Sequence, residues 1–79
     1  MASSGQLERA VLQILWDHPD GVIAGDVQAA LEGRDLAMTT VLTVLDRLRR
    51  KGLASRRDET RPHRYFAGVR REDYIATIM

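Results

Sequence analysis

The feature that most constrains the fold of this chain is the spacing of its apolar residues, which changes along the sequence. Over most of residues 6–52 the apolar side chains recur at intervals of three and four, which is the pattern of helices with one buried face. Residues 53–57 and 63–67 instead fit short strands, and the polar loop between them fits a hairpin. The spacing therefore predicts helices first and one hairpin after them.

The first helix is predicted over residues 6–17, because its apolar residues gather on one helical face. Ser3, with Gln6 three positions later, fits a capping box at its start, and Ser4 is an alternative cap. Pro19 lies in a run of turn formers that ends the helix.

A very short strand and a second helix are predicted to follow this turn. Val22 and Ile23 fit the strand, and residues 24–32 fit the helix, with Gly33 as a left-handed stop. The start of this helix is poor, because Ile23 offers no capping oxygen and Gly25 lies in the first turn.

A third helix is predicted over residues 38–51, ending at Gly52. Its buried stripe consists of four aliphatic residues within about 100° of arc: Val41, Val44, Leu45 and Leu48. After the hairpin, another amphipathic helix begins at Arg70 and carries two acidic residues in its first turn. Its apolar residues are Tyr74, Ile75, Ile78 and Met79. No stop signal follows them, so the chain is expected to end inside this helix.

These segments predict a mainly helical fold with a small β-hairpin, in the order helix, strand, helix, helix, strand, strand, helix. Three short helices followed by a basic hairpin form a winged helix-turn-helix, which is an arrangement that binds DNA. We expect a winged-helix DNA-binding domain over residues 1–69 and the start of a truncated C-terminal dimerisation helix over residues 70–79.

Length and composition exclude several other classes of protein. A chain of 79 residues is too small for a deep active-site cleft. It has no cysteine, which excludes disulfides, zinc knuckles and thiol chemistry. Its apolar stretches are too short to span a membrane. The N-terminus does not have the layout of a signal peptide, so a cytoplasmic location is expected.

The net charge of +1 hides a strong asymmetry along the chain. Residues 1–36 carry a net charge of −4, residues 37–71 carry +7, and residues 72–79 carry −2. Such a division indicates that one face of the protein binds an anionic partner.

The exposed side of the third helix carries candidate base-reading residues. Thr39 and Thr43 lie opposite the buried stripe, with Thr40 and Leu42 on the flanks. A threonine hydroxyl donates or accepts hydrogen bonds, and its methyl group can contact the thymine methyl. The alternative is that Thr39 and Thr40 only initiate a helix that has no other cap, and spacing alone does not separate the two interpretations.

Four of the last five residues of this helix are basic: Arg47, Arg49, Arg50 and Lys51. They could simply complement the negative end of the helix dipole. Four cations exceed that need, and Arg47 and Arg50 lie on the exposed half, so phosphate contact is favoured. Asp46 also points outward, and we expect it to pair with Arg50 or to orient Arg49.

Basic residues also line the hairpin: Arg56, Arg57, Arg61, His63 and Arg64. In a winged helix this loop reaches an adjacent groove or phosphate, a contact for which we favour Arg61 and Arg64. Asp58 and Glu59 lie among these arginines, and the alternative is that the loop charges only pair with one another.

Three other features have competing interpretations. Tyr65 and Phe66 could stack on bases, but neighbouring strand residues point to opposite faces, so one is expected to pack on the third helix. Trp16 is expected in the core or in an interface. His18 lies between two aspartates and could bind a metal, but a solvated turn is favoured because such close neighbours are not preorganised. No catalytic group and no cofactor site are visible.

Several segments resemble the penicillinase repressor and methicillin-resistance regulator family. The sequence LERAVL at residues 7–12 is similar to that family's opening helix. The run TTVLTVLDRL at 39–48, followed by KGL at 51–53, is similar to its recognition helix and is the most specific part. HRY at 63–65 resembles its second wing strand, and the whole resemblance covers roughly residues 6–75.

The resemblance implies a winged-helix repressor that binds double-stranded DNA and occludes a pseudo-palindromic operator as a dimer. It implies that base edges are read by Thr39, Thr40 and Thr43, and we expect Leu42 on their flank to take part. It implies phosphate contacts from Arg47, Arg50 and the wing, and to these contacts we assign Lys51, Arg57, Arg61, His63 and Arg64. Dimerisation would begin at Tyr74, Ile75 and Ile78, so this chain alone is expected to be monomeric or weakly dimeric.

Three positions depart from the pattern of the family. Ile23 and Ala37 stand where many relatives have a Ser or Thr cap, and Leu42 lies on a flank that is polar or basic in some relatives. An alternative hypothesis for the whole chain is a winged-helix protein-interaction module whose basic face binds an acidic partner.

Overall fold

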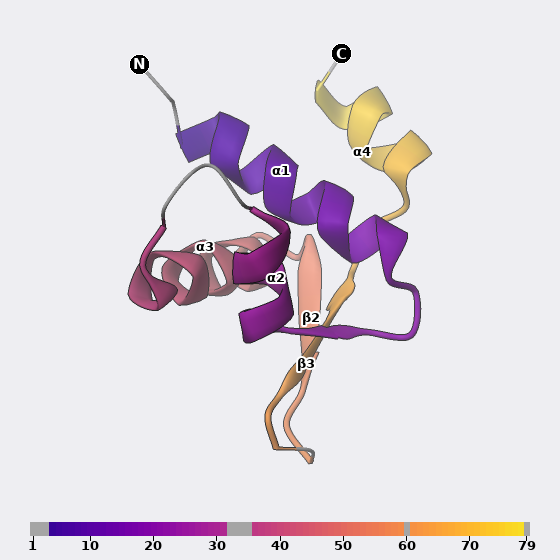
Figure 1. Ribbon diagram of the computed structural model, residues 1–79. Helices are drawn as coiled ribbons and strands as arrows, with labels where there is room; N and C mark the ends of the chain where they lie inside the picture. Colours follow the sequence, from indigo (N-terminus) through magenta and orange to yellow (C-terminus); the bar gives the residue numbers. More distant parts are fainter. Residues whose placement is uncertain (1–3, 32–35, 60, 79) are drawn as a thin grey trace.

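Helices precede a hairpin and one more helix follows it, within the residues that the structure describes, 4–31, 36–59 and 61–78 (Figure 1). The structure is a computed structural model. Its elements in chain order are α1 (Ser4–Asp17), β1 (Val22–Ile23), α2 (Ala24–Ala30), α3 (Met38–Arg50), β2 (Ala54–Arg57), β3 (Arg64–Ala67) and α4 (Arg71–Ile78). This order confirms the predicted winged-helix arrangement.

The short strand β1 extends the hairpin into a three-stranded antiparallel sheet in the described part of the chain. β3 is its central strand: Val22 of β1 pairs with Tyr65, and Ala54 of β2 pairs with Ala67 on the other side. Because β1 directly precedes α2, its pairing with Arg64 and Tyr65 connects the half of β3 nearest the hairpin loop to the helices. Figure 1 shows that the rest of the hairpin projects away from them.

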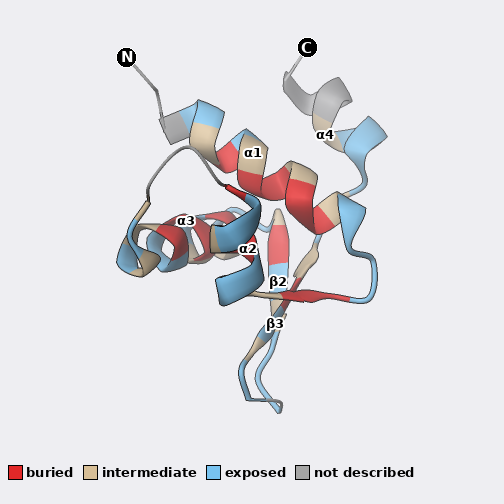
Figure 2. Cartoon of the chain, viewed as in Figure 1, coloured by how far each residue is buried: buried red, intermediate tan, exposed pale blue. Residues whose placement is uncertain are grey.

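The core lies where α1, α2 and α3 meet the sheet (Figure 2). Leu12 of α1 packs there with Leu45 and Leu48 of α3, and all three side chains are fully buried. All four members of the stripe predicted for the third helix are buried. Tyr65 is buried and Phe66 is half-buried, as expected for neighbouring residues on opposite faces of a strand.

The ends of the helices differ from the prediction by one or two residues. α1 begins at Ser4, so Ser4 is a helical residue and the prediction of it as a cap was wrong, while Ser3 lies outside the described residues. α2 and α3 end one or two residues early, with Leu31 and Lys51 as their C-caps. The backbone N–H of Leu31 is shared between the carbonyls three and four residues back, which tightens the last turn. Gly33, the predicted stop, lies outside the described residues.

Several expectations about the connections are confirmed. Ile23 and Ala37 occupy the N-cap positions of α2 and α3, and neither makes a side-chain capping hydrogen bond. Pro62 lies between β2 and β3, where it interrupts neither strand. α4 begins at Arg71, one residue after the predicted start.

Trp16, near the end of α1, connects this helix to α4. Its indole Nε1 donates a hydrogen bond to the carbonyl oxygen of Val69, at 2.8 Å. Its ring meets Tyr74 of α4 edge-on with 5.7 Å between ring centroids, and the Arg71 guanidinium carbon lies 5.4 Å from the centroid of the indole. The expectation that Trp16 lies in the core or in an interface is confirmed.

Candidate nucleic-acid interface

One face of α3 packs in the core, so the opposite face presents the predicted base-reading residues to solvent. Thr39, Leu42 and Thr43 are exposed and Thr40 is half-buried. Among the described residues, Leu42 is a large hydrophobic residue that is exposed to solvent, with 42% of its surface accessible. This face therefore combines hydroxyl groups with an apolar group.

The hydroxyl of Thr43 is engaged within the helix. It donates a hydrogen bond to the carbonyl oxygen of Thr39, at 2.8 Å. This bond uses the single hydroxyl proton and leaves the lone pairs of the oxygen as acceptors. While the bond is kept, Thr43 can accept a hydrogen bond from a base and offer its methyl group, but it cannot donate.

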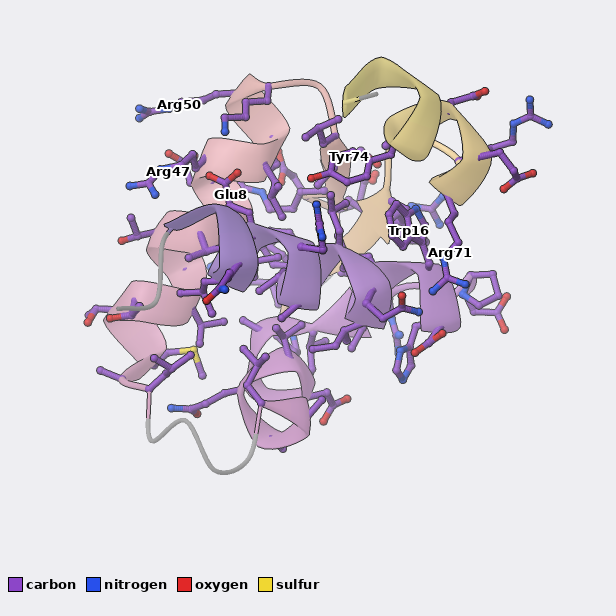
Figure 3. All side chains as sticks on the ribbon, turned by 90° about the horizontal axis from the view of Figure 1, so that it is seen from above. Glu8, Trp16, Arg47, Arg50, Arg71 and Tyr74 are labelled. Atoms are coloured by element: carbon purple, nitrogen blue, oxygen red, sulfur yellow. The ribbon has the colours of Figure 1, made fainter. Side chains whose placement is uncertain are left out.

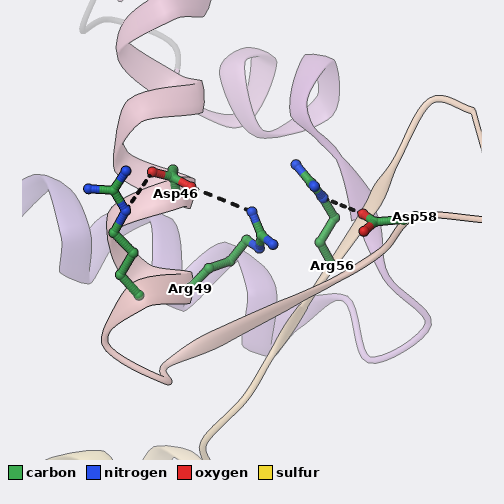
Figure 4. Close-up of polar contacts among 5 residues, drawn as sticks. Asp46, Arg49, Arg56 and Asp58 are labelled. Atoms are coloured by element: carbon green, nitrogen blue, oxygen red, sulfur yellow. Dashed lines mark hydrogen bonds and ion pairs between the residues drawn. The ribbon is translucent and has the colours of Figure 1, made fainter.

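Exposed cations lie beside these threonines. The side chain of Arg50 is 81% exposed and that of Arg47 is 45% exposed. Asp46 carboxylate oxygens lie 3.0 Å from Nε of Arg50 and 3.5 Å from Nη1 of Arg49, which confirms the predicted pairing (Figure 4). Exposed pairs of this kind contribute little to stability, so their main effect is to orient the arginines.

Sequence reasoning missed Glu8, which belongs to α1 but contacts the cations of α3. Its side chain is only 9% exposed, and its Oε1 accepts a hydrogen bond from Nζ of Lys51 at 2.8 Å. Its Oε2 lies 3.8 Å from Nη1 of Arg47. Figure 3 shows Glu8 directed from α1 toward Arg47. The sequence signal was an acidic residue at the edge of an apolar stripe, which does not identify a partner.

Another ion pair lies at the start of the wing loop. Nε of Arg56 donates a hydrogen bond to Oδ1 of Asp58 at 2.5 Å. This hydrogen bond lowers the pKa of the Asp58 carboxyl and raises the pKa of the Arg56 guanidinium. Figure 4 shows the pair beside Asp46 and Arg49, where α3 contacts β2.

The predicted wing residues lie on both strands and on the loop between them: Arg57, Arg61, His63 and Arg64. The guanidinium of Arg57 lies over the ring of Phe66, 5.5 Å from its centroid. Nη1 of Arg64 donates a hydrogen bond to the carbonyl oxygen of Gly21 at 3.2 Å. Arg61 is exposed in the loop, and the histidine is half-buried. Arg57 and Arg64 are therefore partly engaged within the protein.

The structure brings the α3 residues together on one surface. Two shallow hollows flank Thr43 and Arg47, which line both of them. The first hollow is also lined by Leu42 and Arg50, and the second by Thr39. A base edge and a phosphate placed on this surface would meet neighbouring side chains of complementary chemistry.

The predicted dimerisation residues lie elsewhere. Tyr74 packs against Trp16, and α4 lies on the far side of α1 from the hairpin tip (Figures 1 and 3). The side chains of two other predicted residues, Ile75 and Ile78, lie outside the described residues.

The described residues hold neither a cluster of metal-ligating side chains nor a membrane-spanning helix. No group of three or more His, Cys, Asp or Glu side chains among them is placed to hold a metal ion. His18 donates from Nδ1 to the carbonyl oxygen of Ile14 at 2.8 Å, which ties the turn to the end of α1. No helix in the described ranges combines the length and the apolar character needed to cross a bilayer.

The sequence of this chain is similar to those of known proteins. Residues 4–79 match the profile of the family described as Penicillinase repressor. The chain is 42% identical over 76 residues to proteins named Transcriptional regulator BlaI from two Mycobacterium tuberculosis strains, CDC 1551 / Oshkosh and ATCC 25618 / H37Rv. The match covers 95% of this chain and 55% of each relative, so the chain spans about half the length of the curated relatives it matches. Both names describe transcriptional regulators.

Proposed function

Because this chain belongs to the penicillinase repressor family, we propose that it is the DNA-binding domain of a transcriptional repressor. The observation that carries the proposal is the exposed face of α3. There Thr39, Leu42 and Thr43 lie beside the exposed cations of Arg47 and Arg50. Hydroxyl and methyl groups suit base edges, and guanidinium groups suit phosphates.

In this proposal α3 enters the major groove, which is wide enough for an α-helix. The residues that read base edges are Thr39, Thr40, Leu42 and Thr43. The residues of α3 and its C-cap that contact phosphates are Arg47, Arg50 and Lys51. The wing contacts adjacent phosphates or the minor groove through Arg57, Arg61, His63 and Arg64.

Two copies of the protein bind a pseudo-palindromic operator and repress transcription by occluding it. Tyr74, Ile75 and Ile78 belong to the surface that joins the copies. Binding of one half-site then raises the effective concentration of the second domain at the other half-site. A single domain is therefore expected to bind its half-site more weakly than a dimer binds the whole operator.

Substitutions on α3 test the division between base reading and phosphate contact. We expect Thr40→Ala and Thr43→Ala to cost about 1–3 kcal/mol on the preferred operator and little on scrambled DNA. Arg50→Ala should weaken binding to all sequences alike and reduce the salt slope by about one. The measurement is a gel-shift titration at two salt concentrations, with a duplex selected from a random pool and a scrambled duplex of the same composition.

Equal losses on both duplexes for the threonine variants would contradict base reading by α3. If the unsubstituted chain bound both duplexes equally or not at all, its basic face would be better assigned to an acidic protein partner.

A further inference from the structure

Glu8 places a negative charge beside the positively charged face of α3. Its carboxylate bridges two cations, with Lys51 Nζ at 2.8 Å from one oxygen and Arg47 Nη1 at 3.8 Å from the other. Arg47 and Lys51 are four residues apart, so they project from one side of the helix. The contact therefore joins α1 to the same side of α3 that carries its C-terminal cations.

This bridge restrains both cations without removing them from the surface. The side chain of Arg47 is still 45% exposed and that of Lys51 is 51% exposed. A guanidinium has five N–H donors and an ammonium has three, so each group has donors to spare beyond Glu8. Each side chain can therefore contact a phosphate while it remains bound to Glu8.

The burial of Glu8 opposes release of these cations. Its side chain is only 9% exposed, and a buried carboxylate that loses its charged partners is strongly destabilising. DNA phosphates must then meet Arg47 and Lys51 at the positions in which Glu8 keeps them. Arg50 differs, because it pairs with half-exposed Asp46 and its own side chain is 81% exposed. Its guanidinium can therefore move to contact phosphates at different positions.

We propose that Glu8 is a positioning residue for DNA selectivity. It keeps the side chains of Arg47 and Lys51 at fixed positions. It also reduces the net positive charge of the α3 surface that attracts DNA of any sequence. Duplexes whose phosphates lie where these two cations can contact them are favoured, and the affinity for DNA of other sequences is lowered. This inference rests on the function proposed above, because it concerns the same surface.

Glu8→Gln tests the inference, because it removes the charge and keeps the shape and an acceptor for Lys51. We expect binding to scrambled DNA to become tighter, and the ratio of affinities for preferred and scrambled duplexes to fall. The salt slope should steepen by about one, so that affinity falls about 3.5-fold more between about 50 and 200 mM salt. The control is Glu72→Gln, which makes the same charge change at an exposed position of α4 and should leave the ratio unchanged.

The outcomes separate this inference from the proposed function. If Glu8 were only structural, Glu8→Gln would weaken both duplexes alike, lower the Tm and leave the salt slope unchanged, which would overturn the inference alone. An unsubstituted chain with no preference for any duplex would overturn the proposed function and the inference with it. Glu8→Met is a second neutral variant of similar length, and the same shift in ratio and slope is expected if Glu8→Gln does not fold.

Discussion

Single acidic residues accompany the arginines throughout the basic part of the chain. Asp46 pairs with Arg50 at 3.0 Å, and Asp58 pairs with Arg56 at 2.5 Å. The Asp46 carboxylate is half-exposed and that of Asp58 is exposed, so each pair adds little to the free energy of folding. Their effect is local: they orient cations that DNA or another anion can then contact.

The pKa of Asp58 leads to a prediction about acid stability. The hydrogen bond from Arg56 lowers the pKa of this carboxyl in the folded protein. A lowered folded-state pKa contributes stability above the ordinary pKa, and this stability is lost as the pH falls through the folded value. We therefore expect the free energy of unfolding to decline more steeply below about pH 4 in the unsubstituted chain than in Asp58→Asn. Urea unfolding followed by circular dichroism measures this, and parallel pH curves would contradict it.

Among the elements, the turn between α1 and β1 determines how the hairpin meets the helices. Gly21 is buried there with φ +95°, and the Phe66 ring lies 2.7 Å from the position that a Cβ would occupy. Arg64, on the same strand as Phe66, donates to the Gly21 carbonyl. The absence of a side chain therefore allows β3 to pack directly on the turn.

Gly21→Ala should lower the free energy of unfolding by about 1–3 kcal/mol, because the left-handed φ is strained for alanine and the methyl group would overlap Phe66. Gly25→Ala is the matched control. Gly25 lies in α2 with no atom within 4 Å of an added Cβ, so alanine there should stabilise the protein by about 0.5–1 kcal/mol. Urea denaturation of both variants checks the pair, and a neutral Gly21→Ala would show that the turn can move away from β3.

In the whole molecule, charge and helix arrangement separate two surfaces. The net charge of +7 over residues 37–71 belongs to α3, the hairpin and the start of α4, while residues 1–36 carry −4. The hairpin tip and α4 lie at opposite ends of the molecule in Figure 1, so the proposed DNA-contacting wing and the proposed dimerisation helix point in different directions. The position of α4 depends on the contacts of Trp16 and Arg71 described above.

Trp16→Ala should release α4 from α1 without unfolding the remainder of the domain. It removes the hydrogen bond to Val69, the ring contact with Tyr74 and the surface under Arg71. Amide hydrogen exchange should then show lost protection in α4 and retained protection in α1 and α3. Trp16→Phe keeps a ring but not the donor, and an intermediate loss is expected. Unchanged protection of α4 in Trp16→Ala would show that other contacts hold this helix.

The order and type of the elements could be predicted from the sequence, because the spacing of apolar residues reports local structure. It also predicted which residues of α3 are exposed, and the pairing of Asp46 with Arg50, because these features lie within one helix. The helix ends were less accurate: Ser4 lies inside α1, since more than one serine near the start could serve as a cap.

Contacts between residues far apart in the sequence could not be predicted, because they depend on how the elements pack. Glu8 contacts Lys51, 43 residues away, and Trp16 contacts Val69, 53 residues away. Apolar spacing specifies which face of a helix is buried, but not which element covers it. The packing of α1 against α3 and α4 determines those contacts, and it places a buried carboxylate beside the cations of α3 and an indole beneath α4.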